Sequence, residues 1–178
     1  MNASIIAHRY AVALYEYAAE KSADQIIYQD VNLVREQLAT SKKATTFMNS
    51  PNIKISAKKL LLNEVFGSFI NADTLNFLQF VIDQQRQSLL DDILRIYEDI
   101  YRKKHNIFSV ELTTASKLSE SEQLHFRQMI ASKLNGIVDL KIDTNPELIG
   151  GSIVRIDDKL LDTSIKGQLR RIEKQLSE

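Results

Sequence analysis

Apolar residues recur every three or four positions over roughly the first hundred residues of the chain, the spacing typical of amphipathic helices. Proline, glycine and capping residues divide this stretch into six helical segments, and none of them alternates convincingly as a strand would. We therefore predict a mainly helical protein whose N-terminal domain, residues 1–105, is a six-helix bundle.

Local signals set the expected ends of these segments. The third segment must stop before Pro51, because the residue that precedes a proline is pushed out of the α region. Ser56 is expected to cap the fourth segment, and Asn71 or Asp73 the fifth. The sixth segment is expected to begin near Ser88.

The period changes from helical to alternating after His105, and this change marks a domain boundary. A capping box at 119–122 opens a helix that Asn135-Gly136 ends, and alternating apolar residues on either side of that helix predict strands. The strand residues are Phe108, Val110 and Leu112 before the helix, and Val138, Leu140 and Ile142 after it. We expect residues 106–178 to form a small α/β domain with the order β-α-β-β-β-α.

The first and fifth segments carry more apolar surface than one core-facing stripe needs. The residues in question are Tyr10, Ala13, Leu14 and Tyr17 on the first, with Phe77, Phe80 and Val81 on the fifth. One interpretation is that both helices are central and buried all round. The other is a surface groove between them that receives an amphipathic helix of a partner. The pattern alone does not decide between the two.

Composition narrows the class of protein further. Of 178 residues 44% are hydrophobic, and 23 basic residues balance 23 acidic ones, so bulk charge gives no reason to expect a nucleic acid or an anionic membrane as partner. Cysteine is absent, which fits a reducing compartment. No stretch approaches the roughly 20 apolar residues of a membrane span. The first helical pattern begins almost at Met1, and without a leader peptide we expect a bacterial cytoplasmic location.

Signs of catalytic chemistry are nearly missing from the sequence. It contains no dinucleotide-binding or phosphate-binding glycine motif and no metalloprotease helix motif. The histidines His8, His105 and His125 lie on different predicted elements without motif neighbours. The basic run at 102–105 could suggest phosphate binding. It is explained more simply by the dipole of a helix C-terminus, which favours cations. We expect no catalytic residue, cofactor, metal or small-molecule substrate.

The closing stretch, residues 145–176, is the most specific pattern in the chain. Gly150-Gly151 predicts a bulge or a close backbone approach, the strand 153–156 is followed by an Asp-Asp turn, and Asp162 and Ser164 open a capped helix. One face of that helix carries apolar residues, namely Ile165, Leu169, Ile172 and Leu176. Each residue type has a structural role when taken alone; the order of all of them is what is specific.

This order resembles the closing signature of the delta subunit of F-type ATP synthases, called the oligomycin-sensitivity-conferring protein in mitochondria. The segment Arg9 to Leu14, R-Y-A-V-A-L, looks like the opening pattern of that family. Residues 77–97 and 115–119 are similar to its middle patterns, so the resemblance covers essentially the whole chain. Asp157 departs from the glycine that many relatives have at the turn.

The resemblance implies a non-catalytic stator subunit, peripheral to the membrane, that ties the catalytic head to the peripheral stalk. The N-terminal bundle would grip the N-terminal helix of an alpha subunit through the groove residues named above, and the C-terminal domain would take the C-terminal end of the stalk b subunit. Gly150, Gly151, Asp162, Ser164 and Leu169 would act structurally. The alternative function is an RNA-binding or regulatory module, for which a basic face or a G-x-x-G clamp is expected, and the sequence has neither.

Overall fold

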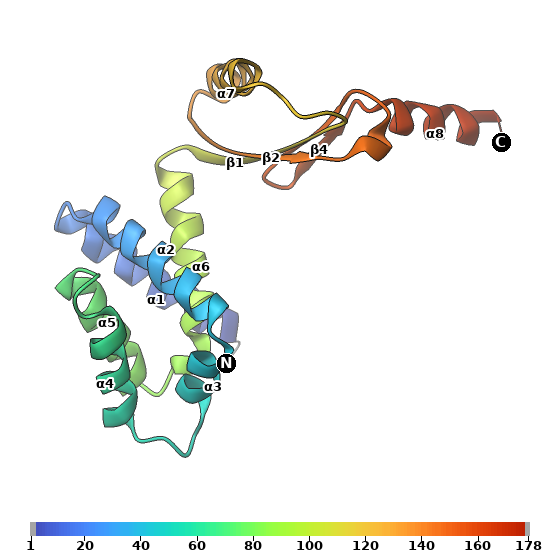
Figure 1. Cartoon of the computed structure of the whole chain (residues 1–178). Helices are drawn as coiled ribbons and strands as arrows, with labels where there is room; N and C mark the ends of the chain where they lie inside the picture. Colours follow the sequence, from blue (N-terminus) through green and yellow to red (C-terminus); the bar gives the residue numbers. More distant parts are fainter. Residues whose placement is uncertain (1–2, 177–178) are drawn as a thin grey trace. The chain divides into compact units, whose positions relative to one another are not determined.

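A computed structural model describes residues 3–176, except for the side chains of Lys42, Thr45 and residues 174–176. The described chain is mostly helical, with a four-stranded mixed sheet in its C-terminal part (Figure 1). The predicted fold class is confirmed at this level. The chain divides into two compact units, Met1–Tyr101 and Arg102–Glu178.

The N-terminal unit is built from helices joined by short turns. They are α1 (Ala3–Glu20), α2 (Asp24–Thr40), α3 (Lys42–Asn49), α4 (Ile55–Phe66), α5 (Ala72–Asp83), a 3-10 turn η1 (Gln87–Leu89) and α6 (Leu90–Lys104), whose last residues enter the second unit. Small residues allow α1 to approach its neighbours closely, because Ala7, Ala11 and Ala18 are its fully buried positions beside Leu14.

The start of α5 is held by two side chains. Asn71 caps the helix and its side chain accepts the backbone N–H of Asp73 at 2.8 Å. The buried carboxylate of Asp30, on α2, accepts the backbone N–H of Asn71 at 2.8 Å and the hydroxyl of Thr74 at 2.6 Å. Asp30 therefore satisfies one backbone N–H that the helix start leaves unpaired, and its two hydrogen bonds fix α5 to α2.

The prediction that Ser56 caps α4 is wrong. The helix begins at Ile55 and its cap residue is Lys54, which makes no side-chain capping bond. The loop before α4 is held instead by Lys58, a buried residue whose ammonium donates to the carbonyl oxygen of Ser50 at 2.8 Å. A contact across the loop thus replaces the hydroxyl cap that local sequence suggested.

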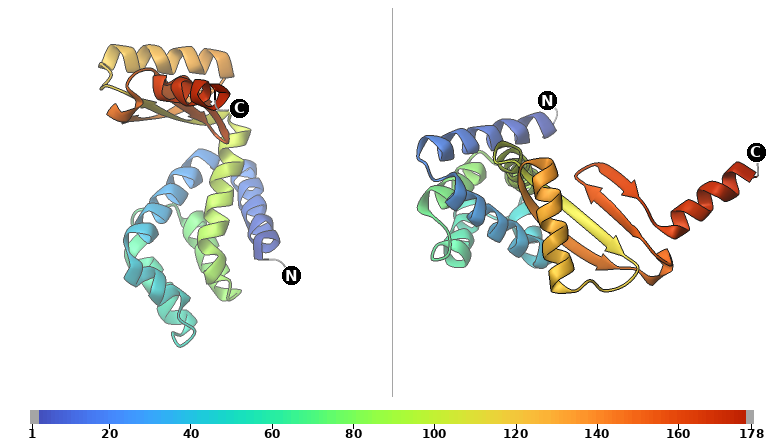
Figure 2. Two further views of the ribbon diagram at one scale, coloured as in Figure 1. Left: turned by 90° about the vertical axis from the view of Figure 1, so that its right-hand side faces the viewer. Right: turned by 90° about the horizontal axis from the view of Figure 1, so that it is seen from above.

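The C-terminal unit contains β1 (Ile107–Thr114), α7 (Glu120–Leu134), β2 (Ile137–Thr144), a 3-10 turn η2 (Pro146–Leu148), β3 (Ser152–Ile156), β4 (Lys159–Asp162) and α8 (Ile165–Leu176). The strand order is β2-β1-β3-β4; β1 pairs with β2 in parallel, and the other pairs are antiparallel. Parallel neighbours need a crossover, which α7 supplies. It lies over one face of the sheet (Figure 2), above a core of Val110, Leu112, Ile130, Val138 and Val154.

The ends of α7 follow the expected signals. Ser119 Oγ accepts the N–H of Glu122 at 3.3 Å, and the Glu122 carboxylate accepts the N–H of Ser119 at 2.8 Å, which confirms the capping box. Hydrogen bonds from Ser119 lower the pKa of Glu122. Asn135 ends the helix in the left-handed region, with φ 50°.

Candidate functional site

An apolar groove of about 470 Å³ lies between α1 and α5. The residues that line it are Arg9, Tyr10, Ala13, Leu14 and Tyr17 from α1, with Asp73, Asn76, Phe77 and Phe80 from α5. Six of the seven residues predicted to form a groove are among them. Ala13 is exposed between the two tyrosines, so α1 presents only a methyl group to the groove at this position.

The wide apolar arc of each helix divides into a buried face and a groove face. On α5 the core side is formed by Thr74, Leu78, Val81 and Ile82. Phe80 points the other way and is 49% exposed. Burial all round, the first of the two interpretations, therefore does not describe these helices in the structure. The surface groove does.

Two of the predicted groove residues belong to the core. Leu14 is 2% exposed and forms part of the floor of the groove, whereas Val81 is fully buried and does not line it. Val81 follows Phe77 by one turn, but it lies on the side of α5 that Leu78 shares, because the helix advances about 100° per residue. Replacing Leu14 or Val81 with aspartate would place a charge in the core and destabilise the fold. Such a variant could therefore lose partner binding for reasons unrelated to the groove.

The two ends of the groove differ chemically. At one end the rings of Tyr10 and Phe80 lie 6.0 Å apart. At the other, the Tyr17 hydroxyl donates to Asp73 Oδ1 at 2.8 Å, and the ammonium of Lys21 donates to the same oxygen at 3.0 Å. Lys21 also sits 4.6 Å above the Tyr17 ring.

These contacts shift the titration of both charged groups. Hydrogen bonds from Tyr17 and then Lys21 lower the pKa of Asp73. Hydrogen bonds with Tyr17 and then Asp73 raise the pKa of Lys21. Both groups therefore stay charged at neutral pH. The apolar pattern alone missed Arg9, Asp73 and Asn76, although each lies three or four residues from a predicted groove residue on its helix.

Asp162 and Ser164 form the start of α8. The buried Ser164 hydroxyl accepts the N–H of Gly167 at 3.0 Å and donates to Asp162 Oδ1 at 2.6 Å. The same oxygen accepts the backbone N–H of Ser164 at 2.9 Å. These hydrogen bonds lower the pKa of Asp162, and the bond from the Ser164 side chain has the largest effect. The geometry is that of a helix cap and has no feature of an acid or base in catalysis.

Gly150 and Gly151 allow a close backbone approach. Gly151 has φ +74°, and a Cβ there would lie 2.5 Å from the carbonyl oxygen of Thr163. The carbonyl of Gly150 accepts the N–H of Ile165 at 3.0 Å, so this loop is joined to the first residue of α8. Of the two structural roles predicted for the glycines, close approach is the one observed.

The apolar face of α8 is exposed. Ile165, Leu169 and Ile172 are 43%, 54% and 52% exposed, while the side chain of Leu176 lies outside the described residues. Figure 1 shows α8 leading away from the sheet. Gly150 links this face to a groove of about 730 Å³ beside α7, because it lines that groove and a Cβ built on it would touch Ile165. Apolar residues of the groove include Phe126, Met129, Pro146 and Ile149.

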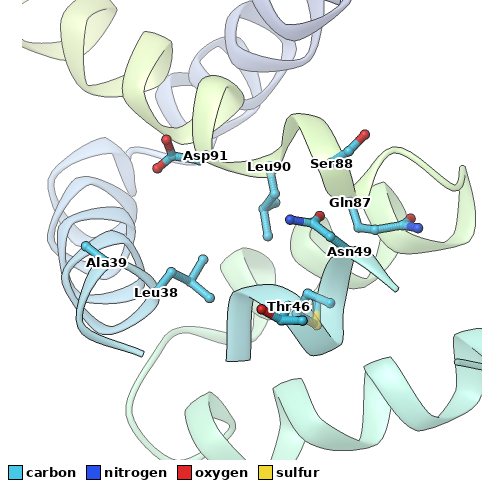
Figure 3. Close-up of a pocket in the computed structure, with 9 residues that line it drawn as sticks. Leu38, Ala39, Thr46, Asn49, Gln87, Ser88, Leu90 and Asp91 are labelled. Atoms are coloured by element: carbon cyan, nitrogen blue, oxygen red, sulfur yellow. The ribbon is translucent and has the colours of Figure 1, made fainter. Parts of the chain in front are cut away.

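Another cavity lies between the end of α2, α3 and the start of α6. Figure 3 shows Leu38 and Leu90 pointing into it. Its polar side chains include Thr46, Asn49 and Asp91, and they form no arrangement typical of catalysis. Among the described residues there is no group of His, Cys, Asp and Glu side chains that would hold a metal ion. No described helix combines the length and apolar character needed to cross a membrane.

Comparison with known proteins shows the family to which this chain belongs. The family model described as ATP synthase delta (OSCP) subunit matches residues 6–176. The chain is 36% identical over 172 residues to the chloroplastic ATP synthase subunit delta of Porphyra purpurea, covering 96% of this chain and 92% of that protein. It is 32% identical over 177 residues to ATP synthase subunit delta of Bacillus thuringiensis, covering 99% and 98%.

A solved structure has the same fold. A chain of the Toxoplasma gondii mitochondrial ATP synthase hexamer superposes with a TM-score of 0.75 over 97% of both chains, at 23% sequence identity.

Proposed function

Because the chain belongs to the ATP synthase delta (OSCP) subunit family, we propose that its two units bind different subunits of the ATP synthase and so hold the catalytic head to the peripheral stalk. As a member of this family it is a non-catalytic subunit of the peripheral stalk. The alternative, an RNA-binding or regulatory module, has no support from the comparisons.

The N-terminal unit, proposed as the domain of residues 1–105, binds the N-terminal helix of an alpha subunit in the groove between α1 and α5. The observation that carries this assignment is the groove itself, which is apolar and open and runs between two neighbouring helices. One helix face with apolar residues at spacings of three and four is the partner that such a groove fits. Exposed Ala13 leaves the space into which a large side chain of the partner inserts.

The C-terminal unit, proposed as the domain of residues 106–178, takes the C-terminal end of the stalk b subunit. The support is the exposed face of α8, which continues through Gly150 into the groove beside α7. A contiguous apolar surface of this kind is typical of a protein–protein interface. We place the assembly at the cytoplasmic face of a bacterial membrane, since bacterial delta subunits are among the relatives of the chain.

The proposed contact with the alpha subunit can be tested by a substitution that fills the groove and leaves the core residues unchanged. Ala13→Trp adds a large side chain at an exposed groove position, and Ala19→Trp adds the same side chain at an exposed position of α1 outside the groove. We expect Ala13→Trp to reduce binding to the purified catalytic head at least tenfold and Ala19→Trp to leave it unchanged. Binding is measured at high salt, where apolar capture persists. Equal binding by both variants would place the alpha contact elsewhere.

A further inference from the structure

We propose that Asn135, the residue that ends α7, is a site of deamidation and that the folded chain holds this reaction back. Asn135 is exposed and is followed by Gly136, which makes the one asparagine–glycine pair in the sequence. Deamidation closes a ring between an asparagine side chain and the backbone nitrogen of the next residue, and glycine has no side chain to hinder the closure. Asn135 lies outside the residues that line the two grooves proposed as subunit contacts.

The reaction needs no partner except water and a base from solvent. The backbone nitrogen of Gly136 loses its proton and attacks Cγ of the Asn135 side chain. The bond between Cγ and the amide nitrogen breaks, and that nitrogen leaves as ammonia after taking up the proton. Water then opens the cyclic imide at either of its carbonyl groups. One opening gives aspartate, and the other gives isoaspartate, in which the main chain runs through Cβ and Cγ.

The conformation of Asn135 in the folded chain opposes the ring closure. Its φ is 50° and its ψ is 48°, in the left-handed region. In an L-residue this ψ turns the nitrogen of the next residue almost directly away from Cβ, so the Gly136 nitrogen lies on the side opposite to the carbon that it must attack. The backbone of Asn135 therefore has to leave its folded conformation before the ring can close.

Hydrogen bonds on both sides hold that conformation. The N–H groups of Asn135 and Gly136 donate to the carbonyl oxygen of Ala131, the second of them at 3.3 Å. The N–H of Ile137 donates to the carbonyl oxygen of Asn106 at 2.9 Å. Rotation of the backbone at Asn135 breaks the end of α7 or the start of β2, so deamidation depends on a local opening of this junction.

Isoaspartate would not fit the folded junction, because it adds one carbon to the main chain between α7 and β2. Space there is tight: a Cβ on Gly136 would lie 2.3 Å from the carbonyl oxygen of Asn106 and 2.7 Å from the ring of Phe108. The added carbon would displace the N–H of Ile137 from Asn106 and disturb the register that pairs Ile137 with Ile107. We expect a C-terminal unit that refolds with weaker pairing of β1 and β2.

The first experiment compares the full chain incubated in its native state with the same chain unfolded in guanidinium chloride, at one pH and temperature. Mass spectrometry of the peptide that contains Asn135 measures loss of the amide. The native chain should react at least about tenfold more slowly, because only opened molecules react. Equal rates in the two states would show that the fold does not hold the reaction back, and would overturn the proposal.

Two other asparagines are internal controls in the same samples. Asn106 precedes Ile107, whose β-branched side chain hinders the ring closure, and Asn145 precedes Pro146, which has no N–H to lose. Both should keep their amides in either state. If Asn135 in the unfolded chain reacts no faster than Asn106, it is not a deamidation site.

Two variants separate the longer backbone from the added charge. Asn135→Asp has the charge of the product on a normal backbone, and Asn135→Gly cannot deamidate; aspartate and glycine both accept a left-handed φ. The isoaspartate form of the wild type, separated by chromatography and refolded, should exchange the amide of Ile137 at least about tenfold faster than either variant. The same exchange rate in the isoaspartate form and in Asn135→Asp would show that the junction accommodates the added carbon and would overturn the predicted loss of pairing.

Discussion

Replacing Ser164 with alanine should destabilise the C-terminal unit by about 1 kcal/mol, the typical loss for a helix cap. Ser164 is 1% exposed and its hydroxyl makes two hydrogen bonds, to the N–H of Gly167 at 3.0 Å and to Asp162 at 2.6 Å. The substitution leaves the N–H of Gly167 without this partner. Asp162 is only partly buried, so water replaces the hydroxyl there and adds little to the loss.

Urea unfolding of the full chain, followed by amide signals from each unit, measures the effect. With a denaturant dependence of about 1–3 kcal/mol per molar, the midpoint of the C-terminal signals should fall by about 0.3–1 M. Signals of the N-terminal unit report whether the effect is local. Ser132→Ala is the control, because that exposed hydroxyl only donates to the carbonyl of Gln128 one turn earlier, a bond that contributes little to a helix. The same midpoint for wild type and Ser164→Ala would refute the capping role.

The same variant has a pH signature. The pKa of Asp162 is lowered in the folded protein, first by its hydrogen bond with the Ser164 side chain. The stability that this carboxylate contributes is therefore complete above its unfolded pKa, about 3.9, and is lost as pH falls through the lower folded pKa. The difference in midpoint between wild type and Ser164→Ala should narrow below about pH 4. A constant difference down to pH 2 would show that Asp162 does not act through the serine.

Three further predictions concern the other contacts. Asp30→Ala should cost about 1–3 kcal/mol in urea unfolding, because it removes the buried acceptor of Asn71 and Thr74, whereas Asp99→Ala at an exposed position should cost little. Leu169→Glu should abolish binding to a purified stalk b fragment and Gln128→Glu, the same charge change on an exposed site of α7, should not; equal binding by both would exclude the α8 face. Cutting the chain between His105 and Asn106 should leave ATP hydrolysis intact and abolish proton pumping in reconstituted membranes, and full pumping by the unlinked fragments would refute the tether.

The sequence predicted elements best where one residue type has one local role. The capping box at Ser119 and Glu122 and the left-handed end of α7 at Asn135 depend only on neighbouring backbone, and both are present as predicted. The prediction for Ser56 was wrong because α4 begins one residue earlier, after Lys54, and the loop before it is held by Lys58, which donates to the carbonyl oxygen of Ser50 across that loop. The residues that neighbour Lys58 in sequence do not indicate that its side chain is buried.

The groove between α1 and α5 also depends on contacts that the local sequence does not predict. Periodicity identified α1 and α5 as unusually apolar, but it did not separate the residues that face the core from those that face solvent. Val81 and Phe77 differ by one helical turn, and only the packing of α5 assigns the first to the core and the second to the groove. The polar ends of the groove, at Arg9 and Asp73, required the antiparallel pairing of two segments far apart in sequence.

The junction between the units limits how the proposed tether works. Only His105 and Asn106 separate α6 from β1, and the carbonyl of Asn106 already accepts the N–H of Ile137 at 2.9 Å. A connection this short leaves little slack between the two units, so a load applied to one proposed contact is passed through the backbone of this junction to the other. Under the proposed function the two contacts act in series, because each unit joins the chain to a different subunit. Loss of either contact would separate the head from the stalk, so each apolar surface would have to withstand the rotational load by itself.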